Sequence, residues 1–346
     1  MNILIVTDAW SPQVNGVVRT LQAVCEELEA MGHPVELISP DQFRSLPCPT
    51  YPEIRLALTA SVGDRIENAA ADAIHIATEG PLGIAARRYC IKQNLPFTTA
   101  YHTQFPDYVA KRTKLPARWF WRYIRWFHAP ATAVMVSTPT VERQLHENGI
   151  NHTRHWGRGV DLKLFTADGP RHPAFEGLAG PIMLYVGRVA VEKNVEAFLT
   201  LDHPGTKVVI GDGPALDSLK ARFPDVRFLG KVTGRDLAAA YRSAGVFVFP
   251  SRTDTFGLVL LEALATGTPV AAYPVQGPID VLTDEVACMD ENLTRAVSEA
   301  LKRDRSACAR YAGRFGWEQS AREFLDALMP IERKPNASEA RVLTQA

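Results

Sequence analysis

Residues 182–194 read Ile-Met-Leu-Tyr-Val-Gly-Arg-Val-Ala-Val-Glu-Lys-Asn. The first five residues are apolar and predict a buried strand, whereas the glycine and the charged residues after them predict a turn into a helix. A strand that leads directly into a helix is one unit of a parallel sheet with helices on its faces. This stretch therefore indicates an α/β fold for the second half of the chain.

Similar strand–helix units occur on both sides of a polar, Gly/Pro-rich segment at 168–173. Before that segment, short apolar runs predict strands at 3–6, 35–39, 73–77, 97–101 and 133–137. After it, they predict strands at 182–186, 207–210, 226–229, 246–250 and 269–272. The first helix is expected over 17–31, where Gly32 ends it. The pattern predicts two doubly wound, Rossmann-like domains.

The break between the two sets of units predicts a hinge near residues 166–180. We expect domains at 1–168 and 169–315, a final helix within 316–331 that packs back on the body, and a flexible polar tail at 332–346. Ligands of doubly wound sheets bind at the carboxyl ends of the strands. The chemistry should therefore come from loops that follow strands, in a central cleft between the two sheets.

Composition excludes several classes of protein. The 346 residues are 46% hydrophobic, enough for two cores, and a formal net charge of zero argues against nucleic acid as the partner. The five cysteines are widely spaced and form no Cys-x-x-Cys pair, which indicates a reduced, cytoplasmic protein without a zinc site. Neither a basic leader nor an apolar run of about 20 residues is present, so we expect no signal peptide and no membrane span.

The first candidate site follows the strand at 182–186. Gly187 allows a tight turn, and Arg188 and Lys193 place two cations beside the expected helix N-terminus. Such groups stabilise the negative charge that develops on a departing diphosphate. The alternative is a solvated pair of surface cations, and the motif alone favours neither interpretation.

The second candidate site lies at 250–262, where the sequence reads Pro-Ser-Arg-Thr-Asp-Thr-Phe-Gly-Leu-Val-Leu-Leu-Glu. The candidate contacts to sugar hydroxyls and phosphate are Asp254 and the backbone of Thr255, Phe256, Gly257 and Leu258. Glu262 is suited to accept two hydrogen bonds from a ribose diol. The alternative is that Asp254 serves only as a helix N-cap.

Four weaker candidates occupy other expected strand ends. Gly16 lies in the first strand-to-helix loop, Gly211 in a Gly-rich turn, and His102 directly after a strand. Val232 lies in a loop expected to contact the donor base through its backbone. A lone histidine is more often structural than catalytic, and a lone glycine turn is weak support for a ligand site.

Missing motifs narrow the function further. The sequence contains no Asp-x-Asp, through which many glycosyltransferases hold a divalent metal, so we expect no metal and no cofactor. No Gly-x-Gly-x-x-Gly follows the first strand, which disfavours a dinucleotide-binding oxidoreductase. A Gly-x-Ser-x-Gly nucleophile elbow is also missing.

The chain resembles glycosyltransferase family 4, whose members are retaining enzymes with the GT-B architecture. Residues 187–194 are similar to the family's donor-diphosphate motif, and 254–262 to its Glu-x7-Glu motif with Asp in the first place. Gly16 is similar to the first-loop glycine and His102 to a histidine near the reacting sugar. Residues 158–161, Arg-Gly-Val-Asp, resemble the family's Asn-Gly-Val-Asp turn.

Residues 7–16, 76–83 and 251–257 further resemble two groups within this family. One group comprises sulfoquinovosyl-, glucosyl- and glucuronosyl-diacylglycerol synthases, and the other comprises GDP-mannose-dependent α-mannosyltransferases. The resemblance implies an α/β GT-B fold of two Rossmann-like domains, with the acceptor in the N-terminal domain and the nucleotide sugar in the C-terminal one. Arg188, Lys193, His102 and Asp254 would be catalytic.

The favoured function is metal-independent, retaining transfer of a hexose, glucose or glucuronic acid, from a UDP- or GDP-sugar to a lipid hydroxyl, diacylglycerol above all. The alternatives are a GDP-mannose-dependent α-mannosyltransferase or a polysaccharide glycosyltransferase. From other classes, a nucleotide-sugar hydrolase or epimerase and a non-catalytic nucleotide-sugar binding protein stay open.

Residues 111–128 combine basic and aromatic side chains without any acid. One helical face is basic and another aromatic, a pattern typical of a helix that lies on anionic lipid. The expected membrane contacts are Lys111, Arg112, Lys114, Arg118 and Trp119, which would make the protein peripheral on the inner face of the cytoplasmic membrane. The alternative is an amphipathic helix with core aromatics, and Trp126 and Phe127 are expected in the core in either case.

Overall fold

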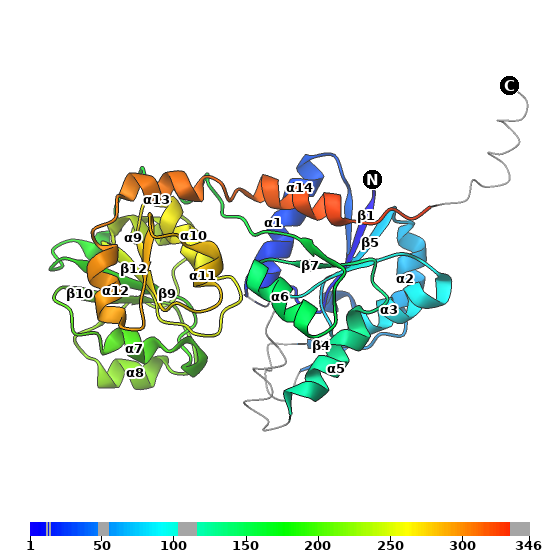
Figure 1. Cartoon of the computed structure of the whole chain (residues 1–346), viewed down its shortest axis with the longest axis horizontal. Helices are drawn as coiled ribbons and strands as arrows, with labels where there is room; N and C mark the ends of the chain where they lie inside the picture. The colour runs from blue at the N-terminus through cyan, green and yellow to red at the C-terminus, as the bar shows by residue number, and fades with distance from the viewer. Residues whose placement is uncertain (12, 14, 48–54, 103–115, 333–346) are drawn as a thin grey trace, which may run out of the picture.

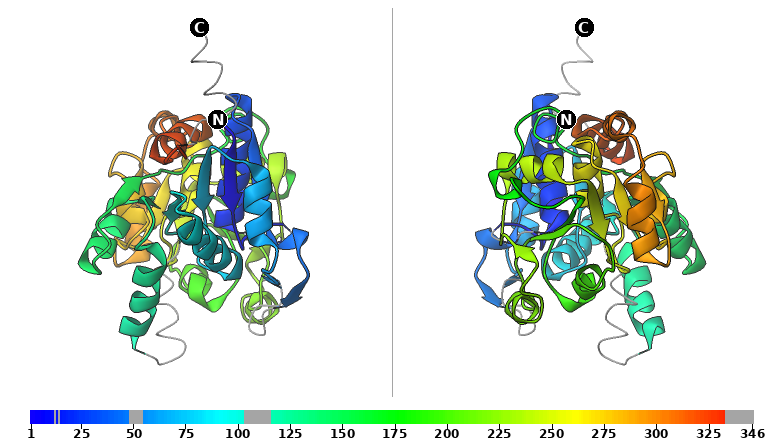
Figure 2. Two further views of the ribbon diagram at one scale, coloured as in Figure 1. Left: turned by 90° about the vertical axis from the view of Figure 1, so that its right-hand side faces the viewer. Right: turned by 90° about the vertical axis from the view of Figure 1, so that its left-hand side faces the viewer.

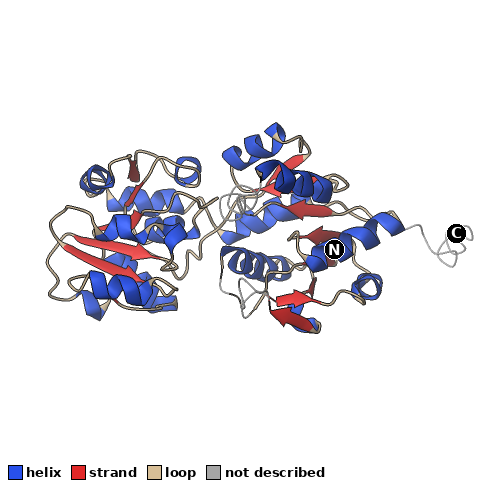
Figure 3. Ribbon diagram, turned by 90° about the horizontal axis from the view of Figure 1, so that it is seen from below, coloured by secondary structure: helices blue, strands red, loops and turns tan. Residues whose placement is uncertain are grey.

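The computed structural model describes residues 1–11, 13, 15–47, 55–102 and 116–332. Two α/β domains lie side by side and are joined by two crossings of the chain (Figure 1). The expectation of an α/β fold with two doubly wound domains is confirmed. Seen from below, each domain has its strands in the middle and helices on both sides (Figure 3).

The first domain contains a parallel sheet of six strands in the order β2-β1-β5-β6-β7-β8. Its strands are β1 Ile3–Val6, β2 Val35–Ile38, β5 Ala73–Ile76, β6 Thr98–Ala100, β7 Ala133–Val136 and β8 Thr153–His155. Its helices are α1 Gly16–Ala30, α2 Val62–Ala69, α3 Pro81–Gln93, α5 Ala117–His128 and α6 Pro139–Glu147. A short antiparallel pair, β3 Ser45–Pro47 and β4 Arg55–Ala57, lies outside the main sheet.

The second domain repeats the arrangement with the strand order β11-β10-β9-β12-β13-β14. Its strands are β9 Ile182–Val186, β10 Thr206–Ile210, β11 Arg227–Phe228, β12 Val246–Phe249, β13 Val270–Ala272 and β14 Ala287–Met289. Its helices are α7 Val195–Leu199, α8 Leu216–Arg222, α9 Gly234–Ser243, α10 Leu258–Ala265, α11 Pro278–Val281, α12 Leu293–Ala300 and α13 Arg305–Ala312.

Burial on both faces explains the continuous apolar strands. In β1, Leu4 and Val6 pack into one hydrophobic cluster, whereas Ile3 and Ile5 pack into a second cluster on the other face. Figure 2 shows the sheets from the two ends of the molecule, with helices on either side. Strands β8 and β14 were not predicted, because both are edge strands of only three residues. The residues of β8 are polar, and those of β14, although apolar, form too short a run to mark a strand.

The last helix, α14 (Trp317–Ala327), returns to the first domain and lies beside α1 (Figure 1). Its Ala321 and Phe324 are fully buried against β1 and α1. The indole N–H of Trp156, just after β8, donates to the Ser320 hydroxyl at 3.1 Å. Helix α14 is therefore part of the first domain's packing, although the chain reaches it from the second domain.

The two crossings of the chain between the domains are bonded to each other. The Val160 N–H donates to the Phe315 carbonyl at 2.8 Å, and Val160 forms a bridge with Gly316. Gly159 permits this approach, because a Cβ there would lie 2.6–2.7 Å from three atoms of Trp317. We refer to these paired crossings as the hinge; they lie outside the stretch 166–180 where the sequence predicts it.

We expect Gly159→Ala to lower the free energy of unfolding by about 1–3 kcal/mol, because the new methyl group has no space and the crossings must separate. Denaturant unfolding measures the change. Gly316→Ala is the matched control, since its Cβ would meet only Leu162 Cδ1 at 3.7 Å. Equal stability of the two variants would contradict this account of the hinge.

Candidate functional site

Loops at the carboxyl ends of strands from both domains meet between the two sheets. The Thr255 hydroxyl, after β12, donates to the His102 carbonyl, after β6, at 3.0 Å. Leu258 Cδ1 lies 4.0 Å from the position of a Cβ on Gly16, the first residue of α1. The structure therefore brings Gly16, His102 and the loop before α10 together, as the strand-end argument predicts.

The glycines of the second domain approach each other backbone to backbone. A Cβ on Gly211 would lie 1.8 Å from the Gly187 carbonyl oxygen, and the Gly187 N–H donates to the Ile210 carbonyl at 3.0 Å. Packing of one strand-end loop on the next thus explains Gly211 without a ligand. Val232 is half-buried in the loop between β11 and α9, where it packs against the domain core.

A helix follows the turn at Gly187, as the sequence predicts, but only after a short irregular stretch. Residues 191–193 form a single 3-10 turn, Asn194 adopts a left-handed conformation, and α7 begins only at Val195 and is five residues long. Asn194 tolerates this backbone better than most residues. Lys193 therefore directly precedes Asn194, the N-cap residue of α7, and lies beside the helix N-terminus, whereas Arg188 lies further back in the loop.

Lys193 instead forms an ion pair with Asp254 across the two loops. The ammonium contacts Asp254 Oδ1, whereas Oδ2 is buried and has no hydrogen-bond partner among the described residues. The alternative of Asp254 as N-cap is wrong, because Gly257 occupies the N-cap position of α10. Gly257 has a φ of +83°, and the Phe256 side chain is buried in the domain core.

Glu262 is buried in α10, with 2% of its surface exposed, and both carboxylate oxygens have partners. Oε1 forms an ion pair with Arg19 of α1, and Oε2 accepts from the Tyr241 hydroxyl at 3.0 Å. Burial, followed by the nearby Glu262 carboxylate, raises the pKa of Tyr241 well above its ordinary value, so the phenol stays a donor. The carboxylate expected to bind a diol is thus held by both domains.

His102 is half-buried at the domain boundary, with its Nε2 atom shielded from solvent. Arg158 Nη2 donates to its Nδ1 at 3.0 Å, and Nε2 has no partner among the described residues. Burial, then the charges of Arg158, His75 and His128, hold the pKa of His102 well below its ordinary value. The imidazole is therefore neutral at physiological pH.

Sequence reasoning missed three residues of this site. Arg19 lies one helical turn after Gly16, so the spacing within α1 could have indicated it. Arg158 occupies the position of Asn in the Asn-Gly-Val-Asp turn of glycosyltransferase family 4, and this difference could have indicated a special role. Nothing in the sequence marked Tyr241.

Helix α5 carries the basic and aromatic residues from 117 to 128, and it projects from the body of the first domain (Figures 1 and 2). Lys111, Arg112 and Lys114 lie outside the described residues. Arg118 is exposed and Trp119 is 64% exposed. Phe127 is fully buried as expected. The expectation of a core position for Trp126 is wrong, because Trp126 is 41% exposed and its ring lies against the Arg87 guanidinium.

The described residues contain no group of three or more His, Cys, Asp or Glu side chains that could hold a metal ion. No helix in that same part of the chain is both long and apolar enough to cross a membrane.

Comparison with known proteins places the chain among glycosyltransferases. The profile of glycosyltransferase family 4 matches residues 14–164, and that of glycosyl transferases group 1 matches residues 180–303. A GDP-mannose-dependent alpha-mannosyltransferase of Corynebacterium glutamicum is 30% identical and covers 83% of this chain and 75% of its own. An alpha-monoglucosyldiacylglycerol synthase of Streptococcus pneumoniae is 26% identical, with coverage of 79% and 71%.

Solved structures share the fold at lower identity. Sucrose-phosphate synthase from Thermosynechococcus elongatus has a TM-score of 0.72 and 20% identity, with 94% of this chain and 97% of that chain covered. HepE of Anabaena, solved with UDP-glucose, has a TM-score of 0.68 and 16% identity, with coverage of 95% and 100%. Both solved structures are similar to this chain in their fold.

We expect Glu262→Gln to raise the KM for a nucleotide-sugar donor more than it lowers kcat, because a ribose contact is made equally in the ground and transition states. A hydrogen bond to a charged group contributes roughly 1.5–3 kcal/mol, so the KM should rise roughly 10–100-fold. Steady-state kinetics with varied donor measure this. Glu299→Gln, which alters an exposed carboxylate paired with Lys302, is the control. An unchanged donor KM with a collapsed kcat would point to a direct catalytic role instead.

Proposed function

This chain belongs to glycosyltransferase family 4, and from that membership we propose that it transfers a hexose, with retention, from a nucleotide-diphosphate sugar to a lipid hydroxyl. The observation that carries the proposal is the 3.0 Å contact between the Thr255 hydroxyl and the His102 carbonyl. This contact brings the polar loop of the second domain, Asp254 to Gly257, to the strand end of the first.

In this proposal the second domain holds the donor. The diphosphate lies beside Arg188 and Lys193, and the ribose contacts Glu262. As the bond to the sugar breaks, negative charge develops on the diphosphate, and cations that are already in place stabilise it without reorganisation. Asp254 contributes by fixing the Lys193 ammonium through their ion pair.

Retention in this site is best explained by attack on the same face of the sugar. Asp254 is engaged by Lys193, so it is a poor candidate for a covalent nucleophile. The acceptor oxygen bonds to the anomeric carbon as the phosphate oxygen leaves, and that phosphate oxygen takes the acceptor proton. Two cations at the diphosphate and the missing Asp-x-Asp support a reaction that needs no metal.

The favoured donor sugar is glucose or glucuronic acid, carried on UDP or GDP, and the favoured acceptor is diacylglycerol. The alpha-monoglucosyldiacylglycerol synthase of Streptococcus pneumoniae supports this choice by its name. The second candidate is GDP-mannose-dependent α-mannosyl transfer, which the higher identity of the Corynebacterium glutamicum relative favours.

Helix α5 supports a lipid acceptor and a peripheral position on an anionic membrane surface. Arg118 and Arg122 are exposed, and Trp119 presents a large aromatic surface to solvent beside them. An indole next to cations suits the boundary between lipid headgroups and acyl chains. The helix belongs to the domain proposed to hold the acceptor.

A panel of radiolabelled UDP- and GDP-sugars, offered with diacylglycerol vesicles or with soluble glycans, tests the function. We expect sugar to be transferred to lipid with and without EDTA. Release of free sugar alone would favour a hydrolase, and donor binding without turnover would favour a binding protein. Faster transfer to soluble glycan would favour the polysaccharide alternative, and activity that is lost on chelation and restored by Mg²⁺ or Mn²⁺ would contradict metal independence.

We expect Arg188→Ala and Lys193→Ala each to slow transfer strongly, because each removes one positive charge from the developing diphosphate. Loss of one such contact lowers kcat about 10²–10³-fold. Lys220→Ala, at an exposed position on α8, is the control for a lost cation. Both variants should keep the unfolding temperature of the unchanged protein. Near-normal turnover in both of them would then refute the diphosphate assignment.

We expect Arg118→Ser combined with Arg122→Ser to weaken binding to anionic vesicles by about 2 kcal/mol, or roughly 30-fold, because each cation near such a surface contributes about 1 kcal/mol. Vesicle co-sedimentation at low salt measures the binding, which should also fall as salt rises. Lys220→Ser combined with Arg222→Ser removes two exposed cations from α8 and should leave binding unchanged. Equal binding by both double variants would remove α5 from the membrane contact.

A further inference from the structure

Arg158 is a buried cation whose role the proposed reaction leaves unexplained. Only 7% of its surface is exposed, and no carboxylate of the described residues lies within ion-pair distance of its guanidinium. Burial lowers the pKa of Arg158 to about 9, so it still carries its charge at neutral pH. A buried charge without a direct counterion is costly, which indicates a purpose beyond packing.

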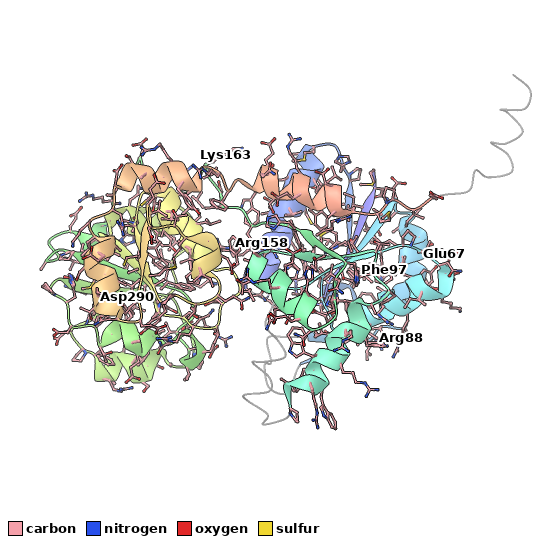
Figure 4. All side chains as sticks on the ribbon, in the orientation of Figure 1. Glu67, Arg88, Phe97, Arg158, Lys163 and Asp290 are labelled. Atoms are coloured by element: carbon pink, nitrogen blue, oxygen red, sulfur yellow. The ribbon has the colours of Figure 1, made fainter. Side chains whose placement is uncertain are left out.

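Three contacts fix the guanidinium in one orientation. Nη1 donates to the Trp156 carbonyl at 2.8 Å and to the Gly157 carbonyl at 3.1 Å. The guanidinium carbon lies 4.3 Å from the centre of the Trp156 ring. Nη2 then reaches His102 Nδ1 at 3.0 Å. Figure 4 labels Arg158 at the edge of the first domain that faces the second.

This contact determines where the proton of His102 lies. A guanidinium only donates hydrogen bonds, so Nδ1 must accept and carry the lone pair. A neutral imidazole has one proton, which is then on Nε2. That N–H is buried and lacks an acceptor among the described residues, whereas buried donors in native proteins normally have one.

We propose that Arg158 is a positioning residue that holds His102 in the Nε2–H form, so that this single N–H donates to an oxygen of the bound donor sugar. The role of His102 toward the sugar rests on the proposed function, but its protonation state does not. Without Arg158, the imidazole can also place its proton on Nδ1, and Nε2 then becomes an acceptor that repels the same oxygen.

The chain offers a close control in Arg87. It is 8% exposed, its Nε and Nη2 donate to the Phe127 and Trp126 carbonyls at 2.9 and 2.7 Å, and its guanidinium lies 4.1 Å from the Trp126 ring. Arg87 therefore repeats the carbonyl contacts and the ring contact of Arg158, and it makes no hydrogen bond to a histidine of the described residues. Arg87→Met reports what the loss of such a buried arginine does to folding alone.

The first experiment is spectroscopic and needs no substrate. Nitrogen-15 NMR of the whole protein distinguishes the two forms of a neutral histidine, and His102→Gln identifies the His102 signals. We expect the Nε2–H form alone in the unchanged protein and in Arg87→Met, and a mixture of both forms in Arg158→Met. An Nδ1–H form in the unchanged protein, or no change in Arg158→Met, would overturn the proposal.

The second experiment is a double-mutant cycle in kcat with detergent-dispersed acceptor. We expect Arg158→Met to lower kcat roughly 100-fold, as loss of one aligned donor does, with donor affinity retained. His102→Ala keeps the carbonyl that accepts from Thr255, and adding Arg158→Met to it should cause no further loss. Arg158→Lys retains a donor and should recover part of the rate. If the fold-losses in kcat of the two single variants multiply in the double variant, the proposal is overturned. Absence of transfer by the unchanged protein would instead refute the proposed function and leave the NMR result unaffected.

Discussion

The pairing of the two chain crossings is the constraint on which the site depends. The hydrogen bond from Val160 to Phe315, with Gly159 close against Trp317, fixes the distance between the domains at one point. Helix α14 then anchors the returning chain through Phe324 and Ser320. Because both sheets direct their strand ends toward the space beside this hinge, small changes in it alter every contact across the cleft.

Two ion pairs occupy the carboxylates of the site. Lys193 neutralises Asp254 within the second domain, and Arg19 reaches Glu262 from the first. The Arg19–Glu262 pair spans the cleft, and its carboxylate is nearly inaccessible to water, so the attraction is screened less than at a surface. A diol that donates hydrogen bonds to Glu262 must share the carboxylate with Arg19 or displace it. The proposed donor contact and the observed contact between the domains would therefore depend on the same carboxylate.

The same side chains also connect the hinge to the chemistry. Ser320 accepts from Trp156, the Trp156 ring lies beside the Arg158 guanidinium, and Arg158 bonds to His102. Each step is a direct contact between side chains, so the orientation of His102 depends on a helix whose sequence lies more than 200 residues away.

The sequence by itself determined the class of fold and most strands, because a strand buried on both faces must be apolar over its whole length, as β1 and β9 are. It also identified the strand-end loops that carry Gly16, His102, Arg188 and Asp254, since parallel sheets gather their loops at one edge. It did not give the edge strands β8 and β14 or the 3-10 turn at 191–193, where no periodic pattern exists. Only the tertiary structure decided the partners: Arg19 pairs with Glu262 across 243 positions, and Arg158 bonds to His102 across 56. The chemistry of a side chain determines which hydrogen bonds it can donate or accept. Packing between segments far apart in the chain determines its partner, and the partner determines its charge and the position of its proton.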